Sequence, residues 1–236
     1  MARNPARSAT RGEDLKTAVA AAAARWIAEE GCDYATAKRR GARDVLGDAV
    51  NLSGAMPDNP LVESELRRYL RLFAADQPTQ LTALRRLALA WMRRLEEFNP
   101  HLVGAVLNGT ATGHSGIHLN LYADSAKDVE IFLLNQSLPF DALDPGPNAE
   151  TTQELLQFLV RAPARSRIDG DVSVTLHVMD PVALRVAPTG RPKDPELHPV
   201  ERAGRANPAM VERLLAETAD IGAAGSADNS DRDQRA

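Results

Sequence analysis

The sequence predicts an α+β protein in which a helical N-terminal half precedes a small sheet. Within residues 13–98, apolar side chains recur three or four positions apart, which is the spacing of one helix face. From His101 the apolar period changes to two, which indicates strands. The 236 residues are 44% apolar but only 4% aromatic, and the many alanines and leucines favour helices. We therefore expect an N-terminal bundle of about four helices, packed with a mixed sheet of about five strands and a crossing helix.

The four helices are amphipathic, so each needs a partner to cover its apolar stripe. The first begins at Glu13, after a polar segment, residues 1–12, that we expect to be disordered. Asp33 is expected to cap the second helix, and Asn59 the third, with a proline in its first turn. The fourth helix begins near Pro78 and has the clearest stripe. That stripe consists of Leu81, Leu84, Ala88, Trp91 and Leu95.

Residues 99–187 are expected to form the α/β region. The predicted strands are at about 102–108, 117–123, 139–143, 152–161 and 172–179. Ser125, with an aspartate three residues later, predicts a helix that runs to about Asn135. Residues 188–236 are rich in Pro, Gly, Ala and Asp, so we expect a largely disordered tail, apart from one short helix at 208–218.

Composition limits the classes of partner. The net charge is −4, with a small basic excess in the first 100 residues and an acidic excess after them. This imbalance is too small to indicate a nucleic-acid binder, although it does not exclude one. Cys32 is the only cysteine, so no intrachain disulfide can form, which suits a reducing compartment. No segment approaches the roughly 18 apolar residues that span a bilayer. We expect a soluble cytoplasmic protein with no membrane partner.

One short stretch carries the main functional signal. The apolar run 102–107 leads into a Gly109-Thr110 turn, a loop of small residues, and a strand Ser115-Gly116-Ile117-His118-Leu119. This order resembles the signature of the polymerase-β-like nucleotidyltransferase superfamily, and the resemblance covers roughly residues 101–161. In that family, the positions of Gly116 and His118 are usually aspartates that hold divalent metal. The resemblance implies a nucleotidyltransferase-like fold, whereas these two residues imply that its metal chemistry is lost.

The candidate site residues follow from this stretch. Gly109, Thr110 and Ser115 are the candidate phosphate-binding residues, because a glycine turn and hydroxyl groups can cradle an anion. No metal site is expected, since Mg²⁺ needs hard oxygen ligands and histidine is a poor substitute. If catalysis survives with rearranged ligands, the candidates are His118, Asp141 and Glu154, and a divalent metal would be the cofactor. His114, His118 and His177 could also converge across neighbouring strands.

Three functions remain open at this stage. The first is a nucleotidyltransferase-like protein that has lost catalysis and acts by binding a nucleotide or a protein partner. The second is an active, divergent, metal-dependent nucleotidyltransferase. The third is a non-enzymatic protein-interaction module that uses the helical half.

Overall fold

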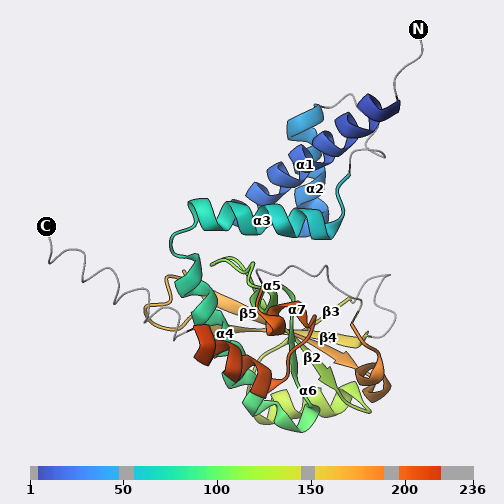
Figure 1. The fold of residues 1–236 in the computed structure, drawn as a ribbon. Coiled ribbons are helices and arrows are strands. Elements are labelled where there is room, and N and C mark those ends of the chain that lie inside the picture. The colour runs from blue at the N-terminus through green and yellow to red at the C-terminus, as the bar shows by residue number, and fades with distance from the viewer. Residues whose placement is uncertain (1–4, 48–55, 145–151, 189–196, 219–236) are drawn as a thin grey trace, which may run out of the picture. The chain divides into compact units, whose positions relative to one another are not determined.

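The protein is described from a computed structural model, which describes residues 5–47, 56–144, 152–188 and 197–218. The chain divides into two compact units (Figure 1). The first unit comprises Met1–Pro78 together with Thr110–His114, and the second comprises Thr79–Gly109 together with Ser115–Ala236. Among the described helices, none combines the length and the apolar content needed to cross a bilayer.

The first unit is built from three helices, α1 (Pro5–Glu30), α2 (Tyr34–Leu46) and α3 (Asn59–Phe73). Helix α1 packs against both α2 and α3. The helices approach closely because small residues line the crossings: a Cβ added at Gly41 of α2 would lie 2.7 Å from the Ala23 nitrogen of α1. A buried cluster fills the centre of the unit. Its members are Ala20, Ala23, Ala37 and Val62.

Two expectations about this unit need correction. Helix α1 begins at Pro5, so residues 5–12 are helical rather than disordered, while residues 1–4 lie outside the described residues. Proline is favoured in a first helical turn because its missing amide hydrogen has no partner there in any case. Helix α3 is capped by Asp58 and not by Asn59, since the Asp58 carboxylate accepts a hydrogen bond from the Leu61 amide at 2.9 Å. The predicted cap of α2 is confirmed: the Asp33 carboxylate accepts from two backbone amides at 2.9 Å each.

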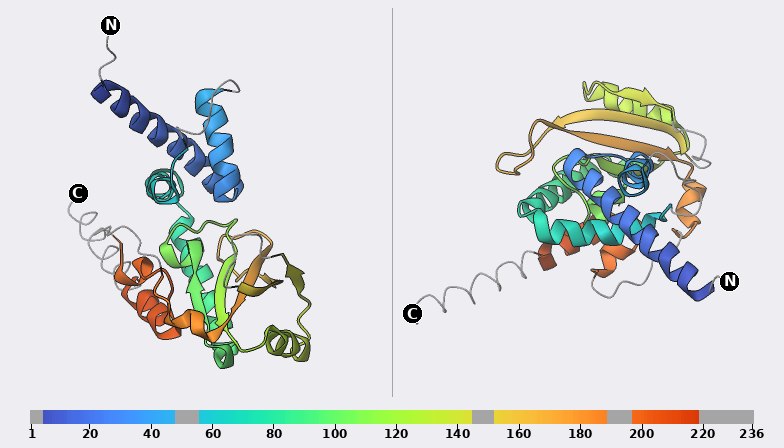
Figure 2. Two further views of the ribbon diagram at one scale, coloured as in Figure 1. Left: turned by 90° about the vertical axis from the view of Figure 1, so that its right-hand side faces the viewer. Right: turned by 90° about the horizontal axis from the view of Figure 1, so that it is seen from above.

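The second unit contains α4 (Gln77–Arg94), which starts in the first unit, and a five-stranded mixed sheet in the order β1-β2-β5-β4-β3. Strands β2 and β5 are parallel, and the other neighbouring strands are antiparallel. The long β4–β5 hairpin is clearest from above (Figure 2, right). The predicted α+β class is therefore confirmed. The strands are β1 His101–Val103, β2 Ile117–Tyr122, β3 Asp141–Leu143, β4 Thr152–Arg161 and β5 Asp171–Met179. The helices that follow α4 are η2 Glu96–Phe98, α5 Gly104–Asn108, α6 Ala126–Asn135, η3 Pro181–Arg185 and α7 Pro199–Arg202.

One face of the sheet is apolar and covered by helices. The Trp91 ring of α4 packs against the Phe158 ring of β4, with ring centroids 4.7 Å apart. Helix α6 contacts β5 and lies along the same sheet, over the range predicted for the crossing helix (Figure 1). The face is formed by alternate residues of the central strands, all of them buried. They are Ile117, Leu119, Leu121, Leu156, Phe158, Val172, Val174, Leu176 and Val178.

Two further segments differ from expectation. Residues 104–108 form α5 and not the end of the first strand, because Gly104 takes a left-handed φ of 72° and breaks the extended run. The described part of the expected tail, residues 197–218, is ordered and packed. Residues 208–218 are helical, and Ala206 pairs with Leu102 at the edge of β1. This segment buries four apolar side chains. They are Val200, Ala206, Val211 and Leu214. Residues 189–196 and 219–236 of the expected tail lie outside the described residues.

Candidate functional site

The Gly109 turn follows a helix and not the strand that the sequence predicted, and a carboxylate adjoins it. Helix α5 ends at Gly109 with φ 85°, and the Gly109 amide donates to the Ala105 carbonyl. A Cβ added at Gly109 would lie 3.0 Å from Glu201 Oε1 and 3.7 Å from Arg85 Nη2. Glu201 and Arg85 carry opposite charges and pair with each other, and together they occupy the space beside this turn that a phosphate would need.

Arg85 and Glu201 form a buried ion pair, with Arg85 Nη2 2.6 Å from Glu201 Oε1. Arg85 also donates to the carbonyls of Val106 and Leu107, which lie in the last turn of α5. Burial lowers the pKa of Arg85, and Glu201 opposes that shift. The pair therefore ties α4, α5 and α7 together. No signal in the sequence pointed to this pair, because Arg85 lies outside the apolar stripe predicted for the fourth helix.

The loop that follows Gly109 belongs to the first unit. The buried Gln77 side chain donates to the Ala111 carbonyl at 2.8 Å. A Cβ added at Gly31 would lie 2.7 Å from the His114 Cβ, so this loop packs directly on the end of α1. Thr110 is buried within this unit, whereas Gly109 and Ser115 belong to the second. The three phosphate candidates are therefore divided between units, and their shared role stays a prediction.

Gly116, where the resemblance would place an aspartate, is closed off by the neighbouring strand. Gly116 directly precedes β2, and a Cβ added there would lie 2.3 Å from Ser173 Oγ and 3.2 Å from the Ser173 carbonyl oxygen of β5. Real Cβ contacts are essentially never as short as the first distance. A carboxylate side chain at this position would require β5 to shift. The glycine is therefore part of the packing of these two segments.

His118, the other residue where the resemblance would place an aspartate, is paired with another histidine. His118 Nδ1 lies 3.1 Å from His177 Nε2 of β5, and the ring centroids are 5.4 Å apart. The parallel register aligns His118 with Thr175 and Asn120 with His177, which places both rings on the face opposite the apolar one. We call His118 and His177 the imidazole pair. Of the three histidines expected to converge, His114 is absent from it and belongs to the first unit.

The imidazole pair is neutral at neutral pH. Burial lowers the pKa of His118 below its ordinary value of 6.5. Burial and, to a lesser extent, the electrostatic effect of His118 lower the pKa of His177 to about 4. Two neutral rings in contact share one N–H···N hydrogen bond, in which either can be the donor.

The imidazole pair belongs to a polar face of the sheet, which we define as His118, Asn120, Gln157, Thr175 and His177. The register of β2, β5 and β4 places these five on one side. Gln157 Nε2 donates to Thr175 Oγ1 at 3.0 Å. The face therefore presents amide, hydroxyl and imidazole groups in one row across three adjacent strands. The signal in the sequence was the alternation of Ser173, Thr175 and His177 with apolar residues in the run 172–178.

The two carboxylates considered as catalytic partners of His118 are not near it. Asp141 is exposed on β3, which is separated from β2 by β4 and β5. Glu154 is on β4 and aligns with Val178, so it lies on the apolar side and not beside His177. On that side it contacts Glu130 of α6. The pKa of Glu154 is raised, first by burial and then by its hydrogen bond with Glu130. The structure thus does not assemble His118, Asp141 and Glu154 into one site.

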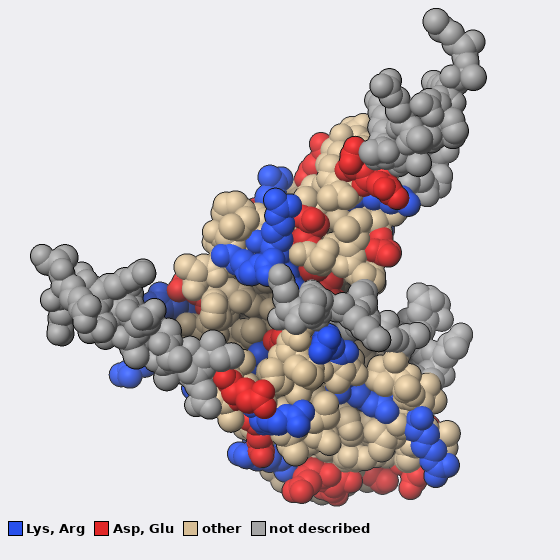
Figure 3. All heavy atoms as spheres, viewed as in Figure 1, with Lys and Arg blue, Asp and Glu red and all other residues tan. Residues whose placement is uncertain are grey.

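Charge on the surface is mixed. Over the face of the second unit drawn in Figure 3, basic and acidic residues are interspersed. On α3, two arginines pair with glutamates of the same helix: Arg67 with Glu63 at 2.6 Å and Arg68 with Glu65 at 3.8 Å. A surface of this kind does not favour a phosphate backbone over other partners.

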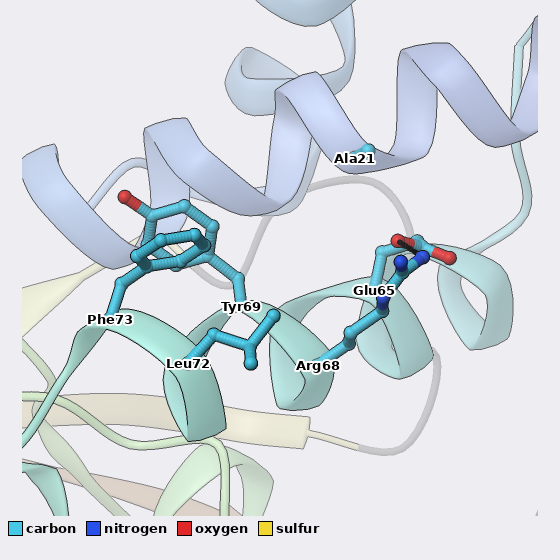
Figure 4. Close-up of a pocket in the computed structure, with 6 residues that line it drawn as sticks. All are labelled: Ala21, Glu65, Arg68, Tyr69, Leu72 and Phe73. Carbon is cyan, nitrogen blue, oxygen red and sulfur yellow. Dashed lines mark ion pairs between the residues drawn. The ribbon is translucent and has the colours of Figure 1, made fainter.

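The first unit holds a shallow pocket between α1 and α3 (Figure 4). The aromatic rings of Tyr69 and Phe73 pack together on one side of the pocket, with their ring centroids 4.8 Å apart. Leu72 and Phe73 are 65% and 69% exposed, which is high for large apolar side chains. Arg68 and Glu65 close the other side of the pocket (Figure 4). The pocket is apolar at one end and charged at the other, which suits a protein segment more than a phosphate.

Within the described part of the chain, no group of three or more His, Cys, Asp or Glu side chains is placed to hold a metal ion. Comparisons of the chain with protein-family models, curated proteins and solved structures each find no match.

Proposed function

We propose that this protein is a nucleotidyltransferase-like protein that has lost metal-dependent transfer and acts by binding a nucleotide on the polar face. The observation that carries the proposal is the state of the two metal-binding positions. Gly116 is closed by Ser173, and His118 is hydrogen-bonded to His177. Neither position offers the oxygen ligands that Mg²⁺ requires.

The chemistry of the polar face supports a nucleotide as the ligand. Asn120 and Gln157 carry amides, which both donate and accept hydrogen bonds and so match the edges of a base. The imidazole pair adds one neutral N–H beyond the hydrogen bond between the rings, and this group can donate to a ribose or phosphate oxygen. The Gly109 turn contributes less than the resemblance implies, because Glu201 adjoins it.

A thermal-shift panel tests the proposal. The full chain is heated with ATP, GTP, CTP or UTP, each with EDTA, Mg²⁺ or Mn²⁺. We expect at least one nucleotide to raise Tm without a metal, by the equivalent of about 2.7 kcal/mol at one hundred times Kd. Gln157→Leu should reduce this shift by at least half. Gln136→Leu, at the end of α6, is the matched control and should leave it unchanged.

Two outcomes would count against the proposal. A metal-dependent labelled product would mean that transfer chemistry survives. If no nucleotide raises Tm, the polar face does not bind nucleotides and the proposal is wrong.

A second candidate function is a protein-interaction module, favoured by the exposed Leu72 and Phe73 beside the α3 pocket. If it holds, Phe73→Ala should abolish partner binding while leaving the nucleotide response unaltered. The exposed apolar Ile131→Ala on α6 is the matched control.

A further inference from the structure

The imidazole pair has the spacing of two ligands on one metal ion. Imidazole nitrogens bind Zn²⁺ at about 2.0–2.1 Å, so nitrogens at right angles around the ion lie about 2.9 Å apart, and nitrogens at a tetrahedral angle about 3.35 Å apart. The observed distance from His118 Nδ1 to His177 Nε2 is 3.1 Å, between these limits. An ion between the two nitrogens would subtend an angle of about 100°.

Both rings can supply a lone pair after a change of tautomer and a rotation that turns each nitrogen toward the ion. The proton that the two rings share needs only to move to the outer nitrogen of its own ring, which is a change of tautomer without net proton release. The rings are also held in place. His118 lies against Gly104 of α5, whose added Cβ would be 3.8 Å from the His118 ring, and both histidines lie on the adjacent, hydrogen-bonded strands β2 and β5. A site on paired strands is more rigid than one on loops.

We propose that His118 and His177 form a two-ligand site for a late divalent transition-metal ion, with Cu²⁺ preferred over Ni²⁺ and Zn²⁺. Imidazole selects these ions over Mg²⁺, and Cu²⁺ stands at the top of the affinity order for a given nitrogen site. Water completes the coordination, because the described residues provide no third His, Cys, Asp or Glu in the cluster. The proposal concerns the two rings alone and holds whether or not the polar face binds a nucleotide.

The test is a calorimetric titration of the full, tag-free chain with each metal alone. We expect one equivalent of Cu²⁺ to bind, Ni²⁺ and Zn²⁺ to bind more weakly, and Mg²⁺ to give no heat. His177→Gln and His118→Asn each remove a ligand while keeping a polar nitrogen near the lost one. Each should weaken Cu²⁺ binding at least about tenfold, since even loss of an outer-shell partner costs 10–100-fold. His101→Asn, on β1 of the same sheet, is the matched control and should bind like the unmodified chain.

Melting curves in EDTA establish that each variant is folded before it is titrated. Equal Cu²⁺ binding by the unmodified chain and by both ligand variants would overturn the proposal, because the ion would then be held elsewhere. Absence of binding by Cu²⁺, Ni²⁺ and Zn²⁺ would overturn it as well.

Discussion

Gly116→Ala tests whether β5 closes the space beside Gly116. The substitution adds a single Cβ, which would lie 2.3 Å from Ser173 Oγ, 3.2 Å from the Ser173 carbonyl oxygen and 3.6 Å from its Cβ. The hydroxyl must leave its present position to make room, and the carbonyl oxygen, which is part of the sheet, can yield only slightly. Overpacking of a fitted site costs about 1–3 kcal/mol, so we expect a loss of about 2 kcal/mol in the free energy of unfolding.

Ser173→Ala provides the partner variant, because it removes the shortest contact and leaves the 3.2 Å one. In that background Gly116→Ala should cost less than about 1 kcal/mol, giving a coupling energy of about 1 kcal/mol or more in a double-mutant cycle. The matched control is Gly12→Ala. A Cβ at Gly12 of α1 meets nothing within 4 Å, so this helical substitution should stabilise by about 0.5–1 kcal/mol.

The assay is urea unfolding followed by the fluorescence of Trp91, which packs on the sheet of the second unit. A Trp26→Phe background removes the signal of the first unit. If Gly116→Ala unfolds at the same urea concentration as its parent, the position is open and the reasoning fails. Equal costs in the two Ser173 backgrounds would show that the serine is not the obstacle.

Three further predictions concern stability. The pKa of His177 is about 4 in the folded protein, against an ordinary value of 6.5. As the pH falls, the unfolded chain therefore binds the proton first, and the free energy of unfolding should fall between pH 6.5 and 4 by up to about 3 kcal/mol. Urea unfolding at several pH values should show a smaller fall for His177→Gln, and an equal fall would contradict the lowered pKa. Gly41→Ala places a Cβ 2.7 Å from the Ala23 nitrogen, so it should lower the free energy of unfolding of the first unit by about 2 kcal/mol or more. Urea unfolding followed by Trp26 fluorescence measures this loss. An unchanged unfolding midpoint would mean that α1 and α2 can move apart without cost. Arg85→Met removes the cationic partner of the largely buried Glu201 carboxylate, which then keeps, among the described residues, only its hydrogen bond from the His198 amide. We therefore expect a loss of about 3–5 kcal/mol by urea unfolding, which the double variant with Glu201→Leu should largely recover. No recovery would show that the backbone contacts of Arg85 matter more than its charge.

The local features of the fold could be predicted because they depend on neighbouring residues. Asp33 caps α2 through amides two and three positions along the chain. The helix predicted to end near Asn135 is α6, because its apolar spacing is a property of ten consecutive residues. Residues 104–108 were assigned wrongly, since a short apolar run fits a strand and a buried helix equally well. The left-handed backbone conformation of Gly104 ends the strand there, so the residues that follow form helix α5.

The candidate site was harder to predict, because it depends on which strands are neighbours. Glu154 and His177 both looked available to His118 in the sequence. The strand order places β5 and not β4 beside β2, and the register turns Glu154 to the other face. Neither property follows from local spacing, since a strand's neighbours are chosen by packing of the whole sheet.

By itself, the amino-acid sequence determined the α+β class, the apolar faces of the helices and the absence of carboxylates at positions 116 and 118. Only the tertiary structure decided that Ser173 fills the space beside Gly116 and that His177, 59 residues further along the chain, is hydrogen-bonded to His118. The physical reason is the distance along the chain between the residues that interact. Helix periodicity and side-chain identity are encoded within a few residues, whereas contacts between strands are set by the register and order of segments that meet only when the chain folds.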